Sequence, residues 1–408
     1  MFTPEQKIEH LKHLKDVDFN EDTTEILKMY QGESFDHSDP MYKKLLEYSY
    51  SICGEFTDLS RLLEAKTSVA QKAMARKQEI LDILFPGHGP IFGGGDDLNA
   101  VIGLVDLDGF NYINSRVDFG KTSLVHLGEY VFVANDVTFG DVENKADRMA
   151  HIDVKPDTWI CAGVGLQDGA KVGGKSVITL GSVVDSGIVL PDRHIITGSP
   201  AIARHEILAG FKSGKEKLEI VRPEEDIREI LKHIRKQGIE GDYTEYTKLL
   251  RNKEYNTLDP TIGRIFDFSH HLVSEYNYPN TTQRRREEIL DILFFMHGDG
   301  FKVGKNLLCD VMGTVNVGRG VHIGDGVNLA GNIEVGNNVD IENRVLLQGL
   351  GHRMLASERR LCQDKRGHIC EWTVPSFIKI ASGVTLKNGT KVASGLVDKD
   401  TEPGEIIR

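Results

Sequence analysis

The sequence predicts a mainly β protein built of two tandem parallel β-helix domains, each preceded by a helical segment. A hydrophobic period of six residues, 42 glycines and an internal repeat support this fold class. The clearest hexads run from Val315 to His352 as VNVGRG-VHIGDG-VNLAGN-IEVGNN-VDIENR-VLLQGLGH. A period of six fits neither an α-helix nor a sheet of hairpins, but it fits a chain wound in triangular coils of short parallel strands.

The same hexads predict the core of the coils. The first aliphatic residues recur every six positions, and they are Val315, Val321, Val327, Ile333, Val339 and Val345. Each is expected to point into the prism and to stack on the residue one coil earlier. Gly, Asn and Asp crowd the remaining positions, and these residues tolerate the left-handed backbone conformation that tight corners often need.

The chain begins with residues that are typical of helices. PEQKIEHLKHLK places Ile8 and Leu11 at helical spacing, and QKAMARKQEILDILF ends at Pro86. We therefore expect residues 1–90 to form a helical cap. Hexads such as TWICAG-VGLQDG-AKVGGK then predict a first β-helix over residues 91–215.

The same organisation recurs in the second half of the chain. LKHLKDVDFNEDTTEILKMY at 11–30 aligns without gaps on LKHIRKQGIEGDYTEYTKLL at 231–250, and EILDILF occurs in both halves. A duplication of a whole unit explains both matches. It predicts a second helical cap over residues 216–298 and a second β-helix over residues 299–408.

Composition narrows the class of function. The net charge of −12 and the pI near 5.7 argue against a nucleic-acid-binding body. The five cysteines are odd in number and lack CxxC spacing, which predicts reduced thiols and a cytoplasmic protein. The polar start MFTPEQKIEH predicts no signal peptide, and no apolar run reaches membrane length. Cys362, His368 and Cys370 lie close together in sequence, but no fourth ligand is evident, so we expect no metal.

Four motifs resemble one known family. They are GESFDHSDP at 32–40, TWICAG at 158–163, GSPA at 198–201 and VLLQGLGHRM at 345–354. On these motifs each half of the chain resembles the maltose and galactoside O-acetyltransferases of the hexapeptide-repeat acyltransferase superfamily. The resemblance implies left-handed parallel β-helices, acetyl-CoA as co-substrate, and a small-molecule acceptor with a sugar or sugar-like hydroxyl. It also implies a homotrimer with active sites in the grooves between neighbouring prisms.

The resemblance assigns roles to single residues. It identifies His352 with the family's general base and places Asn332 near a substrate-binding position. Two residues of the first half also match substrate-binding positions, Asp36 in the helical cap and Asn114 in the β-helix. The residues of the second half that fall at the coenzyme positions are Ser382, Ala393 and Lys399.

Each half departs from the family pattern in a different way. The first half has Asn144 where the second has His352, which predicts that the first β-helix is degenerate and lacks the catalytic base. In the second half Asn256 replaces the acidic residue of the cap, and Lys379 stands where the family has a tryptophan. A two-residue bulge, one hexad and the GSPA tail are also missing there.

Transfer of an acetyl group from a thioester to a hydroxyl requires a base that removes the hydroxyl proton. An imidazole suits this step because its ordinary pKa lies near 6.5, close to working pH. Backbone N–H groups at the coil corners are candidates to stabilise the oxyanion. No Ser or Cys neighbours His352 in sequence, so we expect direct transfer in a ternary complex rather than through an acyl-enzyme.

Structural alternatives stay open for these residues and for the chain. The alternatives are a surface-loop histidine for His352, a solvated charge for Lys399, ordinary hexad positions for Ser382 and Ala393, and turn-ordering roles for Asn114 and Asp36. The chain as a whole would then be a catalytically inactive relative that serves as a scaffold or regulatory binding protein. A site shared between the two halves is disfavoured in a trimer, because a three-membered ring cannot alternate two domain types. A metal-binding β-helix enzyme of the carbonic anhydrase type needs three convergent histidines, which we do not find.

Overall fold

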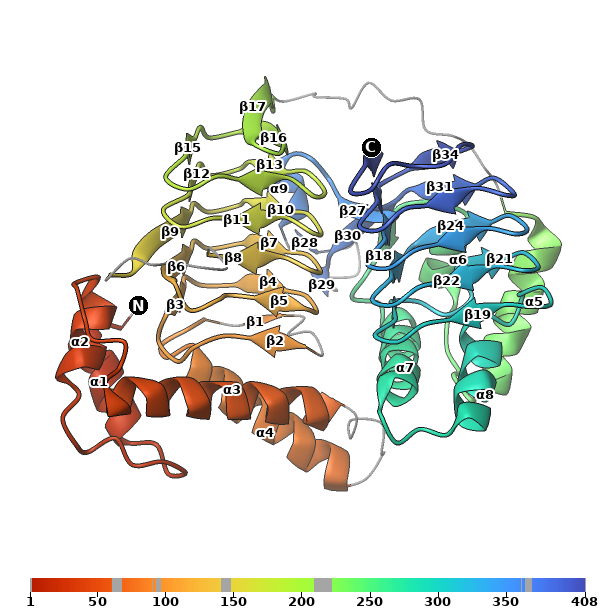
Figure 1. Cartoon of the computed structure of the whole chain (residues 1–408). Coiled ribbons are helices and arrows are strands. Elements are labelled where there is room, and N and C mark those ends of the chain that lie inside the picture. Colours follow the sequence, from red (N-terminus) through yellow and green to blue (C-terminus); the bar gives the residue numbers. More distant parts are fainter. Residues whose placement is uncertain are drawn as a thin grey trace. The chain divides into compact units, whose positions relative to one another are not determined.

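The computed structural model describes residues 2–60, 68–89, 91–92, 97–140, 148–208, 222–360, 362–363 and 369–407. The chain divides into two compact units, Met1–Ala209 and Gly210–Arg408. In each unit helices precede a stack of short-stranded coils, drawn one above the next in Figure 1. Within these residues no helix is long and apolar enough to cross a membrane.

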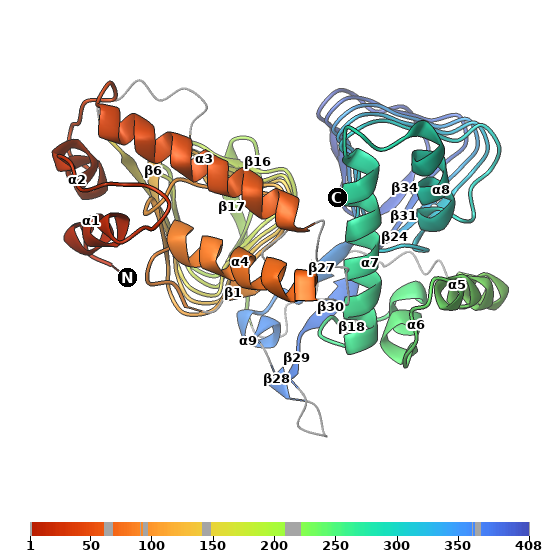
Figure 2. The same cartoon turned by 90° about the horizontal axis from the view of Figure 1, so that it is seen from below.

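Helices open each unit. The last two helices of each set lie beneath the first coil of their own unit (Figures 1 and 2). Thr3 begins the first helix with a capping box, because its side chain accepts a hydrogen bond from Gln6 N. The helices of the first unit are α1 (Pro4–Lys12), α2 (Thr24–Gln31), α3 (Pro40–Ser60) and α4 (Ser68–Leu84). Those that open the second unit are α5 (Glu224–Lys236), α6 (Thr244–Leu250), α7 (Pro260–Asn277) and α8 (Gln283–Leu293).

The strands of the first unit form three parallel sheets, one for each side of a prism. The first sheet holds β1 (Ile91–Phe92), β4 (Asn111–Ile113), β7 (Val131–Val133), β10 (Trp159–Ile160), β13 (Val177–Ile178) and β16 (His194–Gly198), to which β17 (Ala201–Glu206) adds an antiparallel edge. The second holds β2 (Leu98–Asn99), β5 (Val117–Asp118), β8 (Thr138–Phe139), β11 (Gly165–Leu166) and β14 (Val183–Val184). The third holds β3 (Val105–Leu107), β6 (Ser123–Leu127), β9 (Ala150–Val154), β12 (Lys171–Val172) and β15 (Val189–Leu190).

The second unit repeats this plan, and we name its sheets by their first strands. The β19 sheet holds β19 (Lys302–Val303), β22 (His322–Ile323), β25 (Asp340–Ile341) and β32 (Thr385–Leu386). The β20 sheet holds β20 (Leu308–Cys309), β23 (Asn328–Ala330), β26 (Leu346–Gln348), β33 (Lys391–Val392) and β35 (Ile406–Ile407). The β21 sheet holds β21 (Val315–Val317), β24 (Asn332–Val335), β31 (Phe377–Ile380) and β34 (Gly395–Val397).

Strands pair in parallel with strands one coil away, and many of these pairs share one spacing along the chain. Val315 lies beside Ile333 and His322 lies beside Asp340, so one regular coil takes three hexads. The inward side chains are covered, and Ile333 is 0% exposed. The predicted fold class is thus confirmed: two tandem left-handed parallel β-helices, each preceded by a helical segment.

Both units interrupt this winding at the same point, the corner after the second strand of the third coil. In the first unit Phe132 pairs with Trp159, which lies further along the chain than one regular coil would place it. In the second unit Ile333 pairs with Ile378. The extra chain between these two partners is longer than the extra chain in the first unit by one whole coil. Each unit therefore carries an insertion at this corner. The first includes 141–147, so Asn144 lies outside the described residues, and the second carries His352.

Strand order corrects one expectation about the second unit. Trp159 lies on β10, the first strand of the fourth coil, whereas Lys379 lies on β31, the last strand of the third. The counterpart of Trp159 is Thr385, the first residue of β32. The prediction that Lys379 stands at the tryptophan position is therefore wrong. Because hexads repeat, an alignment across insertions of different length slips by one hexad without losing the hydrophobic pattern.

Replacement of Ile333 by alanine tests the contribution of coil stacking. Ile333→Ala removes a fully buried side chain between Val315 and Ile378, so we expect a loss of about 2–5 kcal/mol in the free energy of unfolding. Leu396→Ala is the matched control, because Leu396 lies on the same sheet and is 47% exposed. Urea unfolding of the two variants should separate them, and equal losses would contradict the stacked core.

Candidate functional site

His352 lies on a small sheet that projects from the coil corner. The inserted loop leaves the coil at Gly349 and rejoins it at Ser376, whose N–H donates to Gly349 O at 2.6 Å. Strand β27 (Leu350–His352) runs antiparallel to β30 (Trp372–Pro375), and β30 pairs with β18 (Tyr255–Asn256) of the cap. The three labels lie together in Figure 2. The loop also contains α9 (Ala356–Arg359) and a hairpin of β28 (Cys362–Gln363) and β29 (Ile369–Cys370).

Gly331 allows the coil beneath the loop to approach this exit closely. Its φ is 92°, a conformation that side-chain-bearing residues rarely adopt. A Cβ atom at Gly331 would lie 2.8 Å from the Gly349 carbonyl carbon, so only glycine fits at this level. The backbone bond from Gly349 N to Ala330 O, 2.7 Å long, depends on this approach. The loop is therefore anchored to a rigid corner.

The cap fixes the backbone on both sides of Glu371. Asn256 Oδ1 accepts a hydrogen bond from Glu371 N at 3.0 Å, and Thr257 N donates to Glu371 O at 2.9 Å. The hydroxyl groups of Thr257 and Thr373 lie 2.5 Å apart. Asn256, the counterpart of Asp36 in the first unit, therefore positions the returning strand of the loop.

The loop brings His352 and Glu371 together. Nδ1 of His352 lies 3.7 Å from Oε1 of Glu371. The Glu371 side chain is only 3% exposed, and its Oε1 has no hydrogen-bond partner among the described residues. The His352 side chain is 15% exposed, so only a small part of the imidazole is open to a reactant. The arrangement places the imidazole beside a buried carboxyl group, without a hydrogen bond between Nδ1 and Oε1.

Burial shifts the pKa values of the two groups in opposite directions. It lowers the pKa of His352 to about 4, to which the nearby Arg359 charge adds, while a hydrogen bond with the Trp372 backbone opposes the shift. Burial raises the pKa of Glu371 to about 7. At neutral pH the imidazole is neutral and the Glu371 carboxyl is close to half ionised. The neutral imidazole can accept a proton at this pH, although burial makes it a weaker base than an ordinary histidine.

Arg359 is a third buried group of the loop. It is 2% exposed, and its Nη1 donates to the carbonyl oxygens of Arg353 and Met354. Arg353 in turn forms a two-pronged ion pair with Glu254 of the cap. Arg353 therefore ties the segment after His352 to the cap, and Arg359 holds the backbone of that segment.

Asn332 is completely buried. Its Nδ2 donates to Leu249 O, the carbonyl of the next-to-last residue of α6, at 2.6 Å. Its backbone lies beside Phe377 on β31. The Asn332 side chain thus holds the cap helix against the coil, and a substrate contact for it would need a rearrangement of this bond.

The coenzyme candidates fall at two different corners. Ala393 follows β33, which pairs with β26, so it lies at the corner where the His352 loop leaves the coil. Ser382 follows β31 and Lys399 follows β34, so both lie at the far end of the β21 sheet. Both are exposed, and Ser382 Oγ accepts a hydrogen bond from Asn337 N. The register brings Ala393 to the side of His352 and keeps Ser382 with Lys399.

In the first unit the candidate side chains order their own turns. Asn114 Oδ1 accepts from Ser115 N at 2.8 Å. Asp36 accepts from the hydroxyl and the backbone N–H of Ser38, and these bonds lower the pKa of Asp36. These contacts are the turn-ordering alternatives that the sequence left open.

Sequence reasoning missed Glu371. It lies outside the hexads and well beyond His352 in the chain, and only the antiparallel pairing of β27 with β30 brings the two side chains together. The described residues hold no group of three or more His, Cys, Asp or Glu side chains that would bind a metal ion. His368 and the side chains of Cys362 and Cys370 lie outside the described part of the chain.

The comparisons with known proteins give structural matches alone. No family model matches the chain, and no curated protein matches it. The structure is similar to a hexapeptide-repeat-containing acetyltransferase from Vibrio cholerae in complex with acetyl coenzyme A, at 18% identity over 46% of this chain and 100% of that chain, with a TM-score of 0.36. It is similar to a maltose O-acetyltransferase from Clostridium difficile, at 23% identity over 40% and 91%, with a TM-score of 0.29. It is also similar to a galactoside acetyltransferase in complex with coenzyme A, at 17% identity over 48% and 100%, with a TM-score of 0.35.

The raised pKa of Glu371 predicts a pH-dependent effect on stability. The pKa of Glu371 in the folded state lies above the ordinary value of 4.5. Its contribution to the free energy of unfolding is therefore fully present below pH 4.5 and is lost as the pH rises through about 7. Glu371→Gln removes this loss. We expect the Tm of the variant minus the Tm of the wild type to be higher at pH 8 than at pH 5, by on the order of 5 °C.

Glu358→Gln is the control for this measurement, since Glu358 is an exposed carboxylate on α9 of the same loop. Thermal melts of the three proteins at both pH values provide the comparison. If the Tm difference between Glu371→Gln and the wild type is the same at pH 5 and pH 8, Glu371 does not titrate near neutrality.

Proposed function

We propose that the second unit transfers an acetyl group from acetyl-CoA to a hydroxyl of a sugar or sugar-like acceptor, with His352 as the general base. The observation that supports this most is the partly exposed imidazole backed by the buried Glu371 carboxyl on a loop at a coil corner. The resemblance of VLLQGLGHRM to the catalytic segment of sugar O-acetyltransferases points to the same chemistry.

The reaction needs one proton carrier. The acceptor oxygen attacks the thioester carbonyl carbon while the imidazole of His352 takes the hydroxyl proton. Collapse of the tetrahedral oxyanion breaks the carbon–sulfur bond, and the imidazolium returns the proton to the thiolate of CoA. The products are the acetyl ester and CoA, so no other reactant is required.

Glu371 and Arg359 act on the imidazolium in opposite directions. An ionised Glu371 carboxylate at 3.7 Å stabilises the charged imidazole, whereas Arg359 disfavours it. Ionised Glu371 therefore makes His352 a stronger base, and its own pKa of about 7 places this gain at neutral pH and above. Glu371 is a positioning residue in this scheme because it acts through His352.

One observation favours a second candidate, a catalytically inactive relative that serves as a scaffold or regulatory binding protein. In the first unit Val105 pairs with Val125, which lies beyond the regular coil spacing by a two-residue bulge, whereas in the second unit Val315 pairs with Ile333 at the regular spacing. The bulge is absent from the coil just before the His352 loop. By the resemblance, the substrate-binding position near Asn332 falls where this bulge is missing, so the second unit has fewer polar groups for an acceptor.

We also propose a cytoplasmic homotrimer in which three second units form one ring. This assembly is what the resemblance implies, and it lets His352 face groups of a neighbouring second unit. Among the cysteine side chains that the structure describes, Cys53 and Cys309 form no disulfide, which agrees with a reducing compartment. Sedimentation equilibrium would give the number of chains directly, and a monomer would contradict the ring.

Removal of the imidazole tests the proposed activity. His352→Ala should lower kcat for CoA release with a sugar acceptor by roughly 10²–10⁴-fold, because general-base catalysis contributes about this factor. His322→Ala is the matched control: His322 is another histidine of the second unit, is 55% exposed and pairs with Asp340 at 2.9 Å. Its kcat should stay close to that of the wild type.

The wild-type protein decides between the two candidate functions in the same assay. Acetyl-CoA is offered with a panel of mono- and oligosaccharides, and CoA is detected by its thiol. If no acceptor releases CoA and acetyl-CoA does not bind, the enzyme proposal fails and the inactive relative remains. Equal loss of activity in the two histidine variants would also rule out a specific role for His352.

A further inference from the structure

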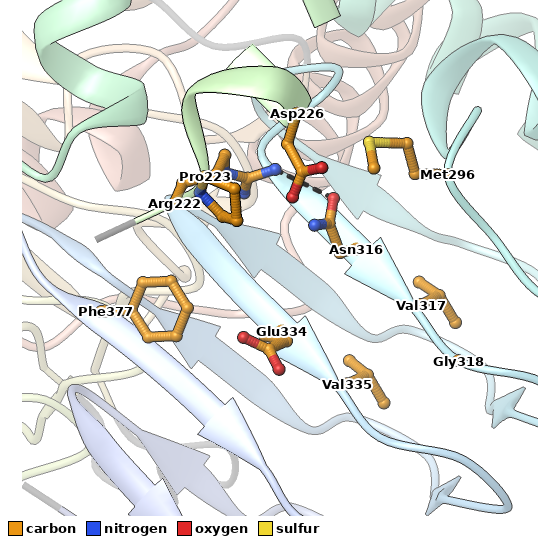
Figure 3. A pocket seen from close by; sticks show the side chains of 10 residues that line it. All are labelled: Arg222, Pro223, Asp226, Met296, Asn316, Val317, Gly318, Glu334, Val335 and Phe377. Carbon is orange, nitrogen blue, oxygen red and sulfur yellow. Dashed lines mark hydrogen bonds between the residues drawn. The ribbon is translucent and has the colours of Figure 1, made fainter. Parts of the chain in front are cut away.

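A pocket of about 360 Å³ opens on the outer face of the β21 sheet. The start of α5 covers it from one side, strands β21, β24 and β31 form its floor, and Met296 closes one end (Figure 3). Its volume lies within the range of small-molecule sites, roughly 300–1,000 Å³. None of the residues proposed for acetyl transfer lines it.

Arg222 forms a fixed wall of this pocket. It is 5% exposed, and its guanidinium donates to Thr314 O at 2.7 Å, to Gly313 O at 3.3 Å and to Asn316 Oδ1 at 2.9 Å. No carboxylate forms an ion pair with it among the described residues. Burial lowers the pKa of Arg222, and the charges of Asp226 and Glu334 act against this shift. The guanidinium is thus held by neutral oxygens while two carboxylates stand apart from it.

The first unit shows what this arrangement replaces. There Lys7 donates to Gly103 O at 2.8 Å and forms an ion pair with Asp106 at 2.8 Å. Gly313 and Asn316 occupy the corresponding places in the second unit. The change from a carboxylate to Asn316 removes the direct counter-charge, and the nearest negative charges become Asp226 and Glu334 across the pocket. The pocket of the second unit is therefore built from groups that the first unit does not have.

The charges around the pocket are already balanced. Glu334 pairs with Lys379 at 2.7 Å, and Asp226 offsets Arg222 electrostatically without contact. An anionic ligand would meet the two carboxylates, and a cationic ligand would meet Arg222. Both are disfavoured, since a charge enclosed without a counter-charge is costly. An uncharged ligand avoids this cost.

The remaining groups suit a ligand with many hydroxyls. Asn316 Oδ1 is engaged by Arg222, which leaves its amide N–H₂ as a donor, and Asp226 and Glu334 supply acceptors on opposite sides. Figure 3 shows Asp226 reaching down from α5 toward Asn316, with Glu334 on the strand below. Phe377 and Met296 add apolar surface for C–H faces. Donors, acceptors and apolar surface in one hollow match the two-sided character of a pyranose ring.

The pocket is also within reach of the reacting group. Phe377 lies a few positions after Thr373, the strand partner of His352. At roughly 3.3 Å per residue the backbones at the two places are at most about 13 Å apart. A sugar longer than one ring spans such a distance.

From these observations we infer that this pocket binds an uncharged sugar and holds the part of the acceptor that is remote from the reacting hydroxyl. The role in holding an acceptor rests on the proposed acetyl transfer, whereas sugar binding by the pocket does not. Binding at a remote group positions the acceptor for reaction.

Binding of four probes to the full-length protein tests this inference. Titration calorimetry and saturation-transfer NMR measure maltose and methyl β-galactoside as neutral probes, glucosamine as the cation and glucuronate as the anion. A neutral sugar should bind saturably and more tightly than either charged probe. Failure of both neutral sugars to bind, or tighter binding of a charged probe, overturns the inference.

Variants localise the bound sugar. Asp226→Ala and Glu334→Gln each remove one hydrogen-bonding carboxylate, so each should lower the affinity for the neutral sugar about tenfold or more. Glu225→Ala is the matched control, because Glu225 is the exposed neighbour of Asp226 on α5. Melting temperatures show that the variants are folded, and unchanged affinity in both pocket variants overturns the inference.

His352→Ala separates this inference from the proposed reaction. The variant should bind the sugar as tightly as the wild type while its turnover falls. If the wild type binds the sugar but shows no turnover, the proposed acetyl transfer is refuted and sugar binding by the pocket is supported. If the protein turns over and Asp226→Ala leaves the KM for the acceptor unchanged, the pocket does not hold the acceptor and the proposed acetyl transfer is supported.

Discussion

The stacking of inward aliphatic side chains once every three hexads is the constraint on which the rest of the second unit depends. Ile333 lies between Val315 and Ile378, and the backbone ladders follow the same register. A residue added within a strand would shift every later side chain to the wrong face. Insertions are therefore accepted at corners, and both units place theirs at the same corner of the third coil. This is why His352 stands on a rigid edge although it belongs to a long loop.

The helical cap helps to hold the His352 loop in place. Three segments hold the His352–Glu371 pair, because β27 carries the histidine, β30 follows the glutamate and the 255–257 segment pins β30. The caps of both units hold one position in the same way, since Glu25 accepts from Asp36 N at 2.7 Å and Glu245 accepts from Asn256 N at 2.8 Å. Asp36 in the first cap and Asn256 in the second occupy this position, and both side chains accept hydrogen bonds from backbone N–H groups. A change from acid to amide there leaves the support of the loop intact.

The sequence was sufficient for the fold because each hexad carries its own strand, corner and inward side chain. Val315 to Val345 predicted the coils, and the repeat predicted a second unit of the same plan. It was insufficient for the site, because the pairing of His352 with Glu371 depends on the register of two antiparallel strands that no hexad encodes. The same limit applies to Asn332, whose buried bond to Leu249 depends on how α6 docks. It applies to Arg222 too, which only the folded cap brings to Asn316.

The pH dependence of kcat in the wild type and in Glu371→Gln tests the central claim, that a carboxylate-supported imidazole in the second unit performs acyl transfer. Wild-type kcat should rise between pH 6 and pH 8 with a midpoint near 7, as Glu371 ionises beside His352. In Glu371→Gln kcat should be lower, and the rise should disappear. A Glu371→Gln profile with the same midpoint and height as the wild type would contradict the account.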